Sequence, residues 1–308
     1  MSKKELLKKL QNKQRKYTML ALDQRGSFSE AYSKTLGRKA KSNEITELKR
    51  KVIKILGKYP SAILIDPIYS RNLATIAPKG ILFCIEKSGY IEKSRERLTE
   101  LQPGFSVQKA IELGAHAIKM NILYNPEASN KTKEYQQGIV ERIGRECRIR
   151  KVPFLLEFVV YAIGEKADTQ GFAKKLPELV IQTAKEFAKA RYSADILKVQ
   201  FPCDLRYVKE FRKFSEGRKP VYTKTEALKF CKAINKIGKP WVLLTAGVPI
   251  EHFIEQLKIA KKAGCSGFLA GRAVWQDVLK IKNPAEQEKW LATKGVKNIK
   301  ALLKIIGE

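Results

Sequence analysis

The chain has 308 residues, of which 44% are apolar, and this length and composition fit an α/β barrel with additional helices. Lys and Arg number 61 against 31 Asp and Glu, and the resulting formal charge of +30 favours anionic ligands such as phosphate. The apolar runs are too short for a membrane span, the Lys-rich N-terminus lacks a signal-peptide core, and no zinc-finger spacing or aromatic-rich basic motif indicates nucleic-acid binding.

Eight short apolar segments predict parallel strands that are buried on both faces, because they are rich in β-branched residues and bounded by turn signals. In chain order these segments are Thr18–Leu22, Ala62–Ile65, Ile81–Ile85, Ala117–Ile122, Phe154–Val159, Ile196–Phe201, Trp241–Ala246 and Gly267–Ala270. Amphipathic stretches between them predict helices, the clearest being Glu44–Leu56, Ser106–Leu113, Lys133–Arg150, Leu176–Arg191, Lys224–Lys236 and Ile250–Ala263. This alternation predicts a (β/α)8 TIM barrel, with a doubly wound open sheet as the alternative.

The two ends of the chain predict additional helices around one barrel domain that extends over residues 1–308. Met1–Lys16 has leucines at helical spacing and predicts an N-terminal helix that caps the barrel base. Ala273–Glu308 predicts further C-terminal helices. The basic residues are spread along the chain, and many, such as Lys49–Lys51, fall on helix faces that we expect to be exposed to solvent.

Four residues near the C-terminal ends of predicted strands suggest chemistry in one pocket, because a parallel barrel gathers these ends together. They are Asp23, Lys119, Glu157 and Lys198. A buried lysine such as Lys198 should have a lowered pKa, lowered further by a second interior cation at Lys119, and would then supply the free amine that imine formation needs. Glu157 lies in an apolar segment, so it should hold its proton to higher pH and act as a general acid or base.

Each of these residues also has a structural interpretation, and the sequence leaves both open. A strand lysine could point outward to solvent, Glu157 could form a salt bridge with a neighbouring lysine, and Asp23 could cap a turn.

The last two predicted strands end in motifs that suggest a phosphate site. Thr245-Ala-Gly247 follows the seventh strand and Ala270-Gly-Arg272 follows the eighth. Barrels commonly bind phosphate in these two loops, through backbone N–H groups at a helix start. We therefore predict phosphate binding by Thr245, Ala246, Gly247, Gly271 and Arg272. Ordinary turn glycines and a solvated arginine are the alternative.

A set of segments forms a joint pattern, in order and with compatible spacing, from about residue 15 to the C-terminal helices. They are Leu20-Ala-Leu-Asp-Gln-Arg-Gly26, Asp66-Pro67, Glu86-Lys-Ser-Gly-Tyr90, Ala117-Ile-Lys119, Pro153-Phe-Leu-Leu-Glu157, Asp195-Ile-Leu-Lys-Val199, Ala246-Gly-Val248 and Ala270-Gly-Arg-Ala-Val-Trp275. Together they resemble the tagatose 1,6-bisphosphate aldolases, which are class I aldolases on a TIM barrel. The resemblance implies that Lys198 forms the imine and that Asp23, Lys119 and Glu157 are the polar catalytic residues around it.

Sulfofructose-phosphate aldolases belong to the same superfamily and are similar in these motifs. The resemblance therefore implies either a distal phosphate or a distal sulfonate, two tetrahedral anions that arginine and amide donors bind alike. Candidates for binding the distal anion and the substrate hydroxyls are Gln24, Arg25, Ser27, Asp66, Arg71 and Glu86. Thr245, where the family often has serine, and the segment Gln200–Asp204 depart from the family pattern near the substrate.

We therefore expect a class I aldolase that cleaves tagatose 1,6-bisphosphate to dihydroxyacetone phosphate and glyceraldehyde 3-phosphate. A sulfofructose-phosphate aldolase is one alternative, and a non-catalytic barrel that binds sugar phosphate is an alternative of another class. Only two histidines are present, which argues against a zinc-dependent aldolase, so we expect no metal or organic cofactor. Five scattered cysteines without a CxxC pair predict reduced thiols in a cytoplasmic protein. We expect a homo-oligomer whose partner is a small sugar phosphate.

Overall fold

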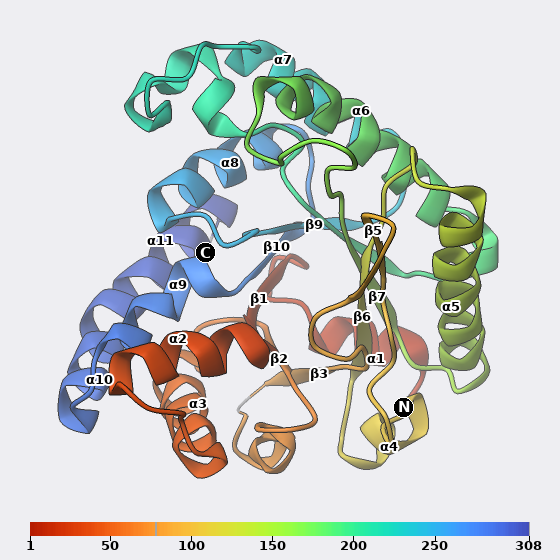
Figure 1. Cartoon of the computed structure of the whole chain (residues 1–308). Helices are drawn as coiled ribbons and strands as arrows, with labels where there is room; N and C mark the ends of the chain where they lie inside the picture. The colour runs from red at the N-terminus through yellow and green to blue at the C-terminus, as the bar shows by residue number, and fades with distance from the viewer. Residues whose placement is uncertain (78, 308) are drawn as a thin grey trace.

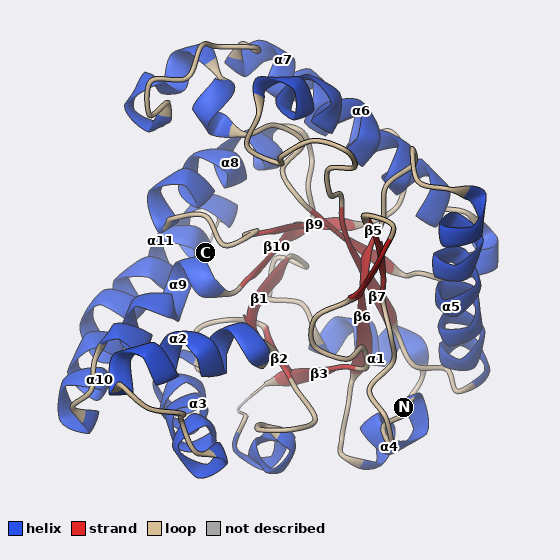
Figure 2. Ribbon diagram, viewed as in Figure 1, coloured by secondary structure: helices blue, strands red, loops and turns tan. Residues whose placement is uncertain are grey.

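The computed structural model describes residues 1–77 and 79–307, and its centre is a closed barrel of eight parallel strands (Figure 1 and Figure 2). The strands are β1 (Tyr17–Leu22), β2 (Ala62–Ile65), β3 (Gly80–Cys84), β6 (Ala117–Leu123), β7 (Phe154–Val159), β8 (Ile196–Val199), β9 (Trp241–Leu244) and β10 (Gly267–Ala270). Each pairs with the next in this order, and β10 pairs with β1 to close the barrel. The predicted barrel is confirmed, although β8 and β9 each end two residues earlier than predicted.

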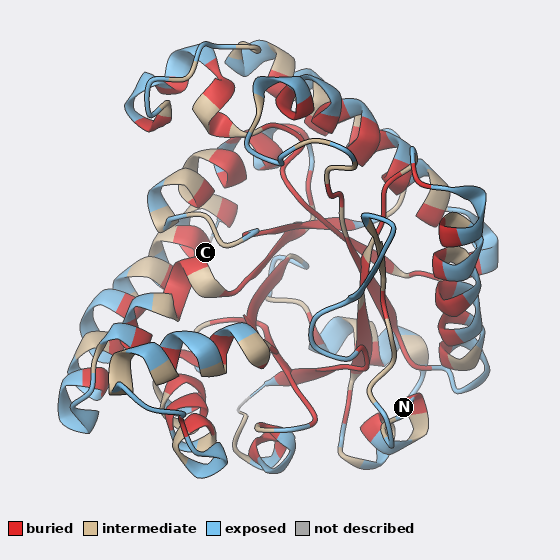
Figure 3. Ribbon diagram, viewed as in Figure 1, coloured by how far each residue is buried: buried red, intermediate tan, exposed pale blue. Residues whose placement is uncertain are grey.

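Side chains along each strand alternate between the barrel interior and the surrounding helices. In β1, Met19 and Ala21 belong to the interior core, whereas Leu20 and Leu22 pack in the outer core beneath the helices. The strands are buried on both faces, while the outer faces of the helices are exposed (Figure 3). Double burial explains why the strands appear in the sequence as near-continuous apolar runs.

The helical ring confirms the six clearest predicted helices and adds one that was not predicted. Between the first and the last barrel strand, the helices are α2 (Gly26–Leu36), α3 (Ser42–Leu56), α4 (Val107–Glu112), α5 (Asn130–Ile149), α6 (Gln170–Phe187), α7 (Lys224–Asn235) and α8 (Ile250–Lys262). Short 3-10 turns are η1 (Arg71–Ile76), η2 (Ala190–Tyr192), η3 (Leu205–Tyr207) and η4 (Lys209–Phe214). The predicted start of α6 at Leu176 was wrong, because Thr169 caps the helix by accepting from the Phe172 N–H at 3.1 Å.

Both chain ends form the predicted additional helices. Helix α1 (Lys3–Lys9) begins with a capping box between Ser2 and Glu5, and Leu10 after it packs in the interior core, so this segment closes the base of the barrel. The tail forms α9 (Arg272–Trp275), η5 (Gln276–Lys280), α10 (Pro284–Trp290), η6 (Leu291–Gly295) and α11 (Val296–Ile306). Helix α11 packs against α8 and α3. Within the described residues, no helix has the length and hydropathy needed to cross a membrane.

The chain between β3 and α4 contains a hairpin that the sequence did not predict. Strands β4 (Ile91–Lys93) and β5 (Glu96–Leu98) pair antiparallel within a segment, residues 86–101, that we call the hairpin arm. Arg97 places its guanidinium over the rings of Tyr90 and Tyr161, at 4.5 and 5.1 Å from their centroids. Glu96 accepts hydrogen bonds from the N–H and hydroxyl of Ser129, at the start of α5. These contacts attach the arm to the body of the barrel.

Lys49 on α3 contradicts the prediction of a solvated basic face. Its side chain is fully buried, whereas Arg50 and Lys51 are half-buried at the surface. The prediction was wrong because Lys49 occupies the inward-facing stripe of α3 with Leu48 and Val52, where its ammonium pairs with the buried carboxylate of Asp66. A count of basic residues cannot distinguish a lysine that reaches solvent from one with an internal partner.

Candidate active site

The alternation of the strands directs four side chains into the barrel interior at the C-terminal mouth. Asp23, Lys119, Glu157 and Lys198 each follow, two positions later, a residue of the interior core. These core residues are Ala21, Ala117, Leu155 and Ile196. The four side chains line one cavity of about 290 Å³. Both strand lysines therefore point inward, and the alternative in which they reach outward to solvent is wrong.

Lys119 is the centre of a buried ion network. Its Nζ lies 2.8 Å from a carboxylate oxygen of Asp23, 2.7 Å from Glu86 and 2.8 Å from Glu157. Glu157 uses its other oxygen to contact Nζ of Lys198 at 3.0 Å. The network therefore joins residues from five separate barrel segments, and one carboxylate bridges the two lysines.

The network fixes the charge states of its members. Burial alone would lower the pKa of Lys119, but Asp23, Glu157 and Glu86 outweigh it and raise this pKa well above its ordinary value. Burial alone would raise the pKa values of Asp23 and Glu157, but the ammonium groups of Lys119 and Lys198 lower both. Two expectations are corrected: Lys119 keeps its proton, and Glu157 does not hold its proton to higher pH, because it lies between two lysines.

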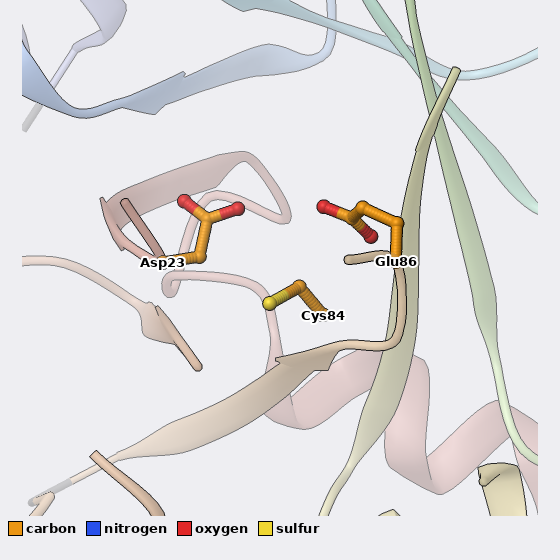
Figure 4. A group of neighbouring side chains, drawn as sticks. All are labelled: Asp23, Cys84 and Glu86. Atoms are coloured by element: carbon orange, nitrogen blue, oxygen red, sulfur yellow. The ribbon is translucent and has the colours of Figure 1, made fainter. Parts of the chain in front are cut away.

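Three potential metal donors lie together (Figure 4), and two of them, Asp23 and Glu86, also line the cavity. The nearest donor atoms of Asp23, Cys84 and Glu86 lie within 4.8 Å of one another. However, Lys119 already donates to both carboxylates, and burial raises the pKa of the Cys84 thiol well above its ordinary value. A metal would have to displace the ammonium and deprotonate the thiol. The donor set therefore fits an internal lysine better than a metal ion.

The two predicted phosphate loops meet at Arg272. Thr245, Ala246, Gly271 and Arg272 line the cavity, whereas Gly247 does not. Ala246 and Gly247 both have positive φ, of 47° and 78°, and a Cβ added to Gly247 would lie 2.8 Å from Nη2 of Arg272. Only glycine therefore lets the loop after β9 pass this close to the guanidinium.

The candidates for the distal anion and the hydroxyls divide into two groups. Gln24, Arg25, Ser27 and Glu86 line the cavity. Arg25 is buried and donates to Oε1 of Gln102 at 3.1 Å and to the carbonyl of Glu86 at 2.6 Å, so its guanidinium is held in place.

Asp66 and Arg71 do not line the cavity. Arg71 lies exposed on η1. Asp66 is fully buried and accepts hydrogen bonds from Lys49, from the Ser70 hydroxyl at 2.7 Å, and from the backbone N–H groups of Ile68 and Tyr69 at 2.9 and 2.7 Å. Because all its hydrogen-bond partners are groups of the protein itself, we interpret Asp66 as a structural residue rather than a ligand-binding one.

The structure adds cavity residues that the sequence interpretation missed. The hairpin arm contributes Lys87, Ser88 and Gly89 to the wall, and β6 contributes Asn121. The alternation of β6 could have identified Asn121, because it follows Lys119 by two positions. The arm residues come from a loop, where no strand periodicity indicates direction.

Unpartnered polar atoms converge on this cavity. Among the described residues, four buried side-chain atoms lack a hydrogen-bond partner: Gln24 Oε1, Arg25 Nε, Glu86 Oε2 and Asn121 Oδ1. All four residues line the cavity. Buried polar groups are nearly always paired in folded proteins, so the cavity offers hydrogen bonds to a polar ligand. Three acceptors and one donor suit hydroxyl groups together with an anion.

Comparison with known proteins identifies relatives over nearly the whole chain. The DeoC/LacD family aldolase model matches residues 17–277. Tagatose 1,6-diphosphate aldolase 1 of Enterococcus faecalis is 36% identical over 298 residues, which cover 94% of this chain and 90% of that protein. The tagatose 1,6-diphosphate aldolases of Lactococcus lactis and Streptococcus pneumoniae are 33% and 34% identical, each covering 99% of this chain and 95% of the relative.

Solved structures show the same fold at lower identity. A Schiff-base-forming fructose-1,6-bisphosphate aldolase superposes with a TM-score of 0.60 at 18% identity, covering 99% of both chains. An archaeal fructose 1,6-bisphosphate aldolase also gives 0.60 at 18% identity, covering 99% of this chain and 98% of the other.

Proposed function

The chain belongs to the DeoC/LacD family of aldolases, and from this premise we propose that it cleaves tagatose 1,6-bisphosphate through an imine on Lys198. The products are dihydroxyacetone phosphate and glyceraldehyde 3-phosphate. The observation that carries this proposal is the contact of 3.0 Å between Nζ of Lys198 and Glu157, inside a cavity that Arg272 also lines. An amine beside a carboxylate, in the same cavity as a guanidinium, supports imine chemistry on a phosphorylated substrate.

The first step begins when the Lys198 ammonium gives a proton to Glu157, and the resulting neutral amine attacks the ketose carbonyl carbon. The nitrogen forms a bond to this carbon and gives one proton to the former carbonyl oxygen, which then leaves as water and leaves a protonated imine. Glu157 contacts the amine directly, and its lowered pKa makes it a proton acceptor in the resting enzyme. It can then return the proton to the departing hydroxyl.

The second step breaks the bond between C3 and C4. The electron pair of this bond moves into the protonated imine and gives an enamine, while the C4 hydroxyl loses its proton and becomes the aldehyde of glyceraldehyde 3-phosphate. Either Glu157 or Asp23 takes this proton. Protonation of the enamine at C3 and hydrolysis of the imine then release dihydroxyacetone phosphate and restore Lys198.

Lys119 serves this chemistry as a fixed cation. Its Nζ lies 2.8 Å from a carboxylate oxygen of Asp23 and 2.8 Å from one of Glu157. This ammonium keeps both carboxylates ionised and oriented toward the same space. Its ammonium also lies within the cavity, where it can donate to a substrate hydroxyl.

The proposal is tested by a substrate panel with purified protein. Tagatose 1,6-bisphosphate, fructose 1,6-bisphosphate and sulfofructose 1-phosphate are supplied in turn, and dihydroxyacetone phosphate is measured with a coupled dehydrogenase. Cleavage of tagatose 1,6-bisphosphate supports the proposal. Turnover of the sulfonated substrate alone supports the sulfofructose-phosphate aldolase, and binding without any turnover supports the non-catalytic barrel.

Arg272→Ala should raise KM for the bisphosphate about 10- to 100-fold, because a charge-assisted hydrogen bond to phosphate is lost. Thermal stability should change little, since no protein carboxylate pairs with Arg272 in the described part of the chain. Arg148→Ala, at an exposed position near the end of α5, is the control. A large loss of thermal stability with an unchanged KM would assign Arg272 to the frame of the barrel instead.

Asn121→Leu should lower kcat/KM about 3- to 10-fold, because one neutral hydrogen bond to a substrate hydroxyl is removed. The buried Oδ1 atom of Asn121 has no partner within the described residues, so the substitution breaks no bond there. Steady-state kinetics and thermal melting are measured together. A variant with lower stability and normal kcat/KM would contradict contact between Asn121 and the substrate.

We also propose that the protein works in the cytoplasm. All five cysteines are free and buried, which fits a reducing compartment. The homo-oligomer stays a prediction, and size-exclusion chromatography with light scattering is its direct measurement.

A further inference from the structure

Helix α3 places one fully buried lysine against the end of β1. In Figure 1, α2 and α3 lie outside the barrel beside β1 and β2. Neither Lys49 nor its partner Asp66 has any side-chain exposure to solvent. The ammonium also lies over the rings of Phe28 and Tyr69, at 5.2 and 5.7 Å from their centroids. It is therefore enclosed on every side that the structure describes.

The hydrogen bonds of Lys49 point to the backbone on either side of a candidate catalytic residue. Nζ donates to the carbonyl oxygen of Leu22 at 2.9 Å and to that of Gln24 at 2.7 Å, and it also donates to the carboxylate of Asp66. Asp23 lies between the two carbonyls. Lys49 thus contacts the peptide group that precedes Asp23 and the peptide group that follows Gln24, and so restrains the backbone on both sides of Asp23.

A second contact restrains the same segment from the opposite end of the chain. The indole N–H of Trp275, on α9, donates to the carbonyl of Ala21 at 2.9 Å. Three carbonyls within residues 21–24 are therefore held by side chains from outside the barrel. On the side that faces the barrel interior, a carboxylate oxygen of Asp23 lies 2.8 Å from Nζ of Lys119.

Stability alone does not explain a buried ion pair at this place. Burying an ammonium and a carboxylate costs several kcal/mol for each ion, and apolar residues of similar volume are often as stable or more so. Lys49, however, uses two of its three N–H groups to donate hydrogen bonds to backbone carbonyl oxygens on either side of Asp23. An apolar side chain could fill this space, but it could not fix these peptide groups.

We propose that Lys49 is a positioning residue for Asp23, holding the turn after β1 so that the carboxylate keeps its contact with Lys119. This inference rests on the proposed function, in which Asp23 acts close to the reacting atoms. Lys49 itself touches no substrate, since it is fully buried and does not line the cavity.

Lys49→Met tests this role because it removes the ammonium and keeps an unbranched side chain of similar length. We expect kcat to fall about 10- to 100-fold, the range typical of residues that orient a catalytic group, with KM changed by less than about 3-fold. Borohydride trapping of Lys198 with dihydroxyacetone phosphate should persist, because the amine and the phosphate loops are unchanged.

Gln136→Met is the matched control for a loss of buried hydrogen bonds. Gln136 on α5 is also fully buried, and its amide donates to the carbonyls of Leu123 at 2.7 Å and Arg97 at 3.1 Å. Neither of these residues lines the cavity. This variant should lose thermal stability while keeping kcat within about 2-fold of wild type.

A double-mutant cycle separates positioning from general stability. In an Asp23→Asn background, Lys49→Met should reduce kcat by less than about 3-fold, since the residue it orients is already disabled. If Lys49→Met lowers kcat by the same factor in the wild-type and Asp23→Asn backgrounds, the proposal is overturned. A folded Lys49→Met variant with normal kcat also overturns it. If Lys49→Met does not fold, Lys49→Gln replaces it, retaining one donor amide. Failure of both to fold assigns Lys49 to stability and also overturns the proposal.

The wild-type protein distinguishes failure of this inference from failure of the proposed function. If the wild type cleaves no member of the substrate panel, the proposed function fails and the inference falls with it. If the wild type is active and Lys49→Met is equally active, only the inference fails.

Discussion

Lys198→Ala abolishes imine formation and lowers kcat by on the order of 10⁴-fold or more, because the nucleophile is removed. The fold should survive, since Glu157 keeps its contact of 2.8 Å with Lys119 after Lys198 is lost. The measurement combines cleavage kinetics with borohydride trapping. Protein incubated with dihydroxyacetone phosphate is reduced, digested and analysed by mass spectrometry, and the adduct is expected on Lys198 of the wild type only.

The control for this variant is Lys185→Ala, at an exposed position on α6. It should trap substrate and turn over like the wild type. An adduct on a different lysine, or substantial cleavage by a folded Lys198→Ala, would contradict the proposed mechanism. Either result would remove the catalytic assignments of Glu157 and Asp23, because both depend on their position around Lys198.

Lys119→Met should cause the largest combined loss of stability and activity. It leaves the carboxylates of Asp23, Glu86 and Glu157 without the cation that all three contact. Breaking a buried ion pair from one side costs about 3–5 kcal/mol, so the free energy of unfolding should fall by at least this order. Activity should fall as well, because the carboxylates lose their orientation and their ionised state.

The pH dependence of Lys119→Met has a defined sign. In the wild type, the pKa values of Asp23 and Glu157 are lower than in the unfolded chain. Ionisation of the two carboxyl groups therefore stabilises the fold at a pH above their unfolded-state pKa values, and this stabilisation is lost as the pH falls through their folded-state pKa values. In the variant, burial dominates and should raise the pKa of Asp23, so its ionisation destabilises the fold as pH rises. The deficit in melting temperature relative to wild type should therefore be larger at pH 7.5 than at pH 5.

Lys175→Met is the control for removing an exposed ion pair. Lys175 contacts Glu165 at 3.3 Å, and half of its side chain is exposed, so its loss should change melting temperature little at either pH. A Lys119→Met deficit that is independent of pH would show that the lysine contributes packing rather than charge.

The barrel could be predicted from local sequence, and so could which residues share one face of each strand, but not which of the two faces is the barrel interior. Parallel strands buried on both faces appear as apolar runs, and a fixed period of two places Lys119 above Ala117 and Glu157 above Leu155. The same rule predicts the position of Asn121. These features depend only on short-range periodicity.

The charge states could not be predicted in the same way, because they depend on which residues meet across the barrel. Glu157 alone in an apolar strand would hold its proton, but Lys119 and Lys198 come from neighbouring strands and reverse the shift. Lys49 illustrates the same limit, since its partner Asp66 lies 17 positions away on another element. Composition indicates that a lysine is present, and only the fold supplies its counter-ion.

The hairpin arm was missed because its order comes from contacts with distant segments. Its strands have three residues each, too few for a periodic signal, and Glu96 and Arg97 are fixed by Ser129 and Tyr161. Without those partners the local sequence resembles an ordinary polar loop.

The attachment of this arm divides the cavity wall into two structurally separate parts. The arm leaves and rejoins the barrel at a narrow neck, where the Lys87 N–H donates to the carbonyl of Glu100 at 2.8 Å and the Gln102 N–H donates to that of Ile85 at 2.8 Å. Apart from Glu86, the members of the ion network around Lys119 belong to the other barrel segments. Insertions or exchanges within the arm can therefore reshape one side of the cavity while the bond-breaking residues stay in place. Residues 87–100 are therefore the segment to exchange when one side of the cavity is to be altered without changing the ion network around Lys119.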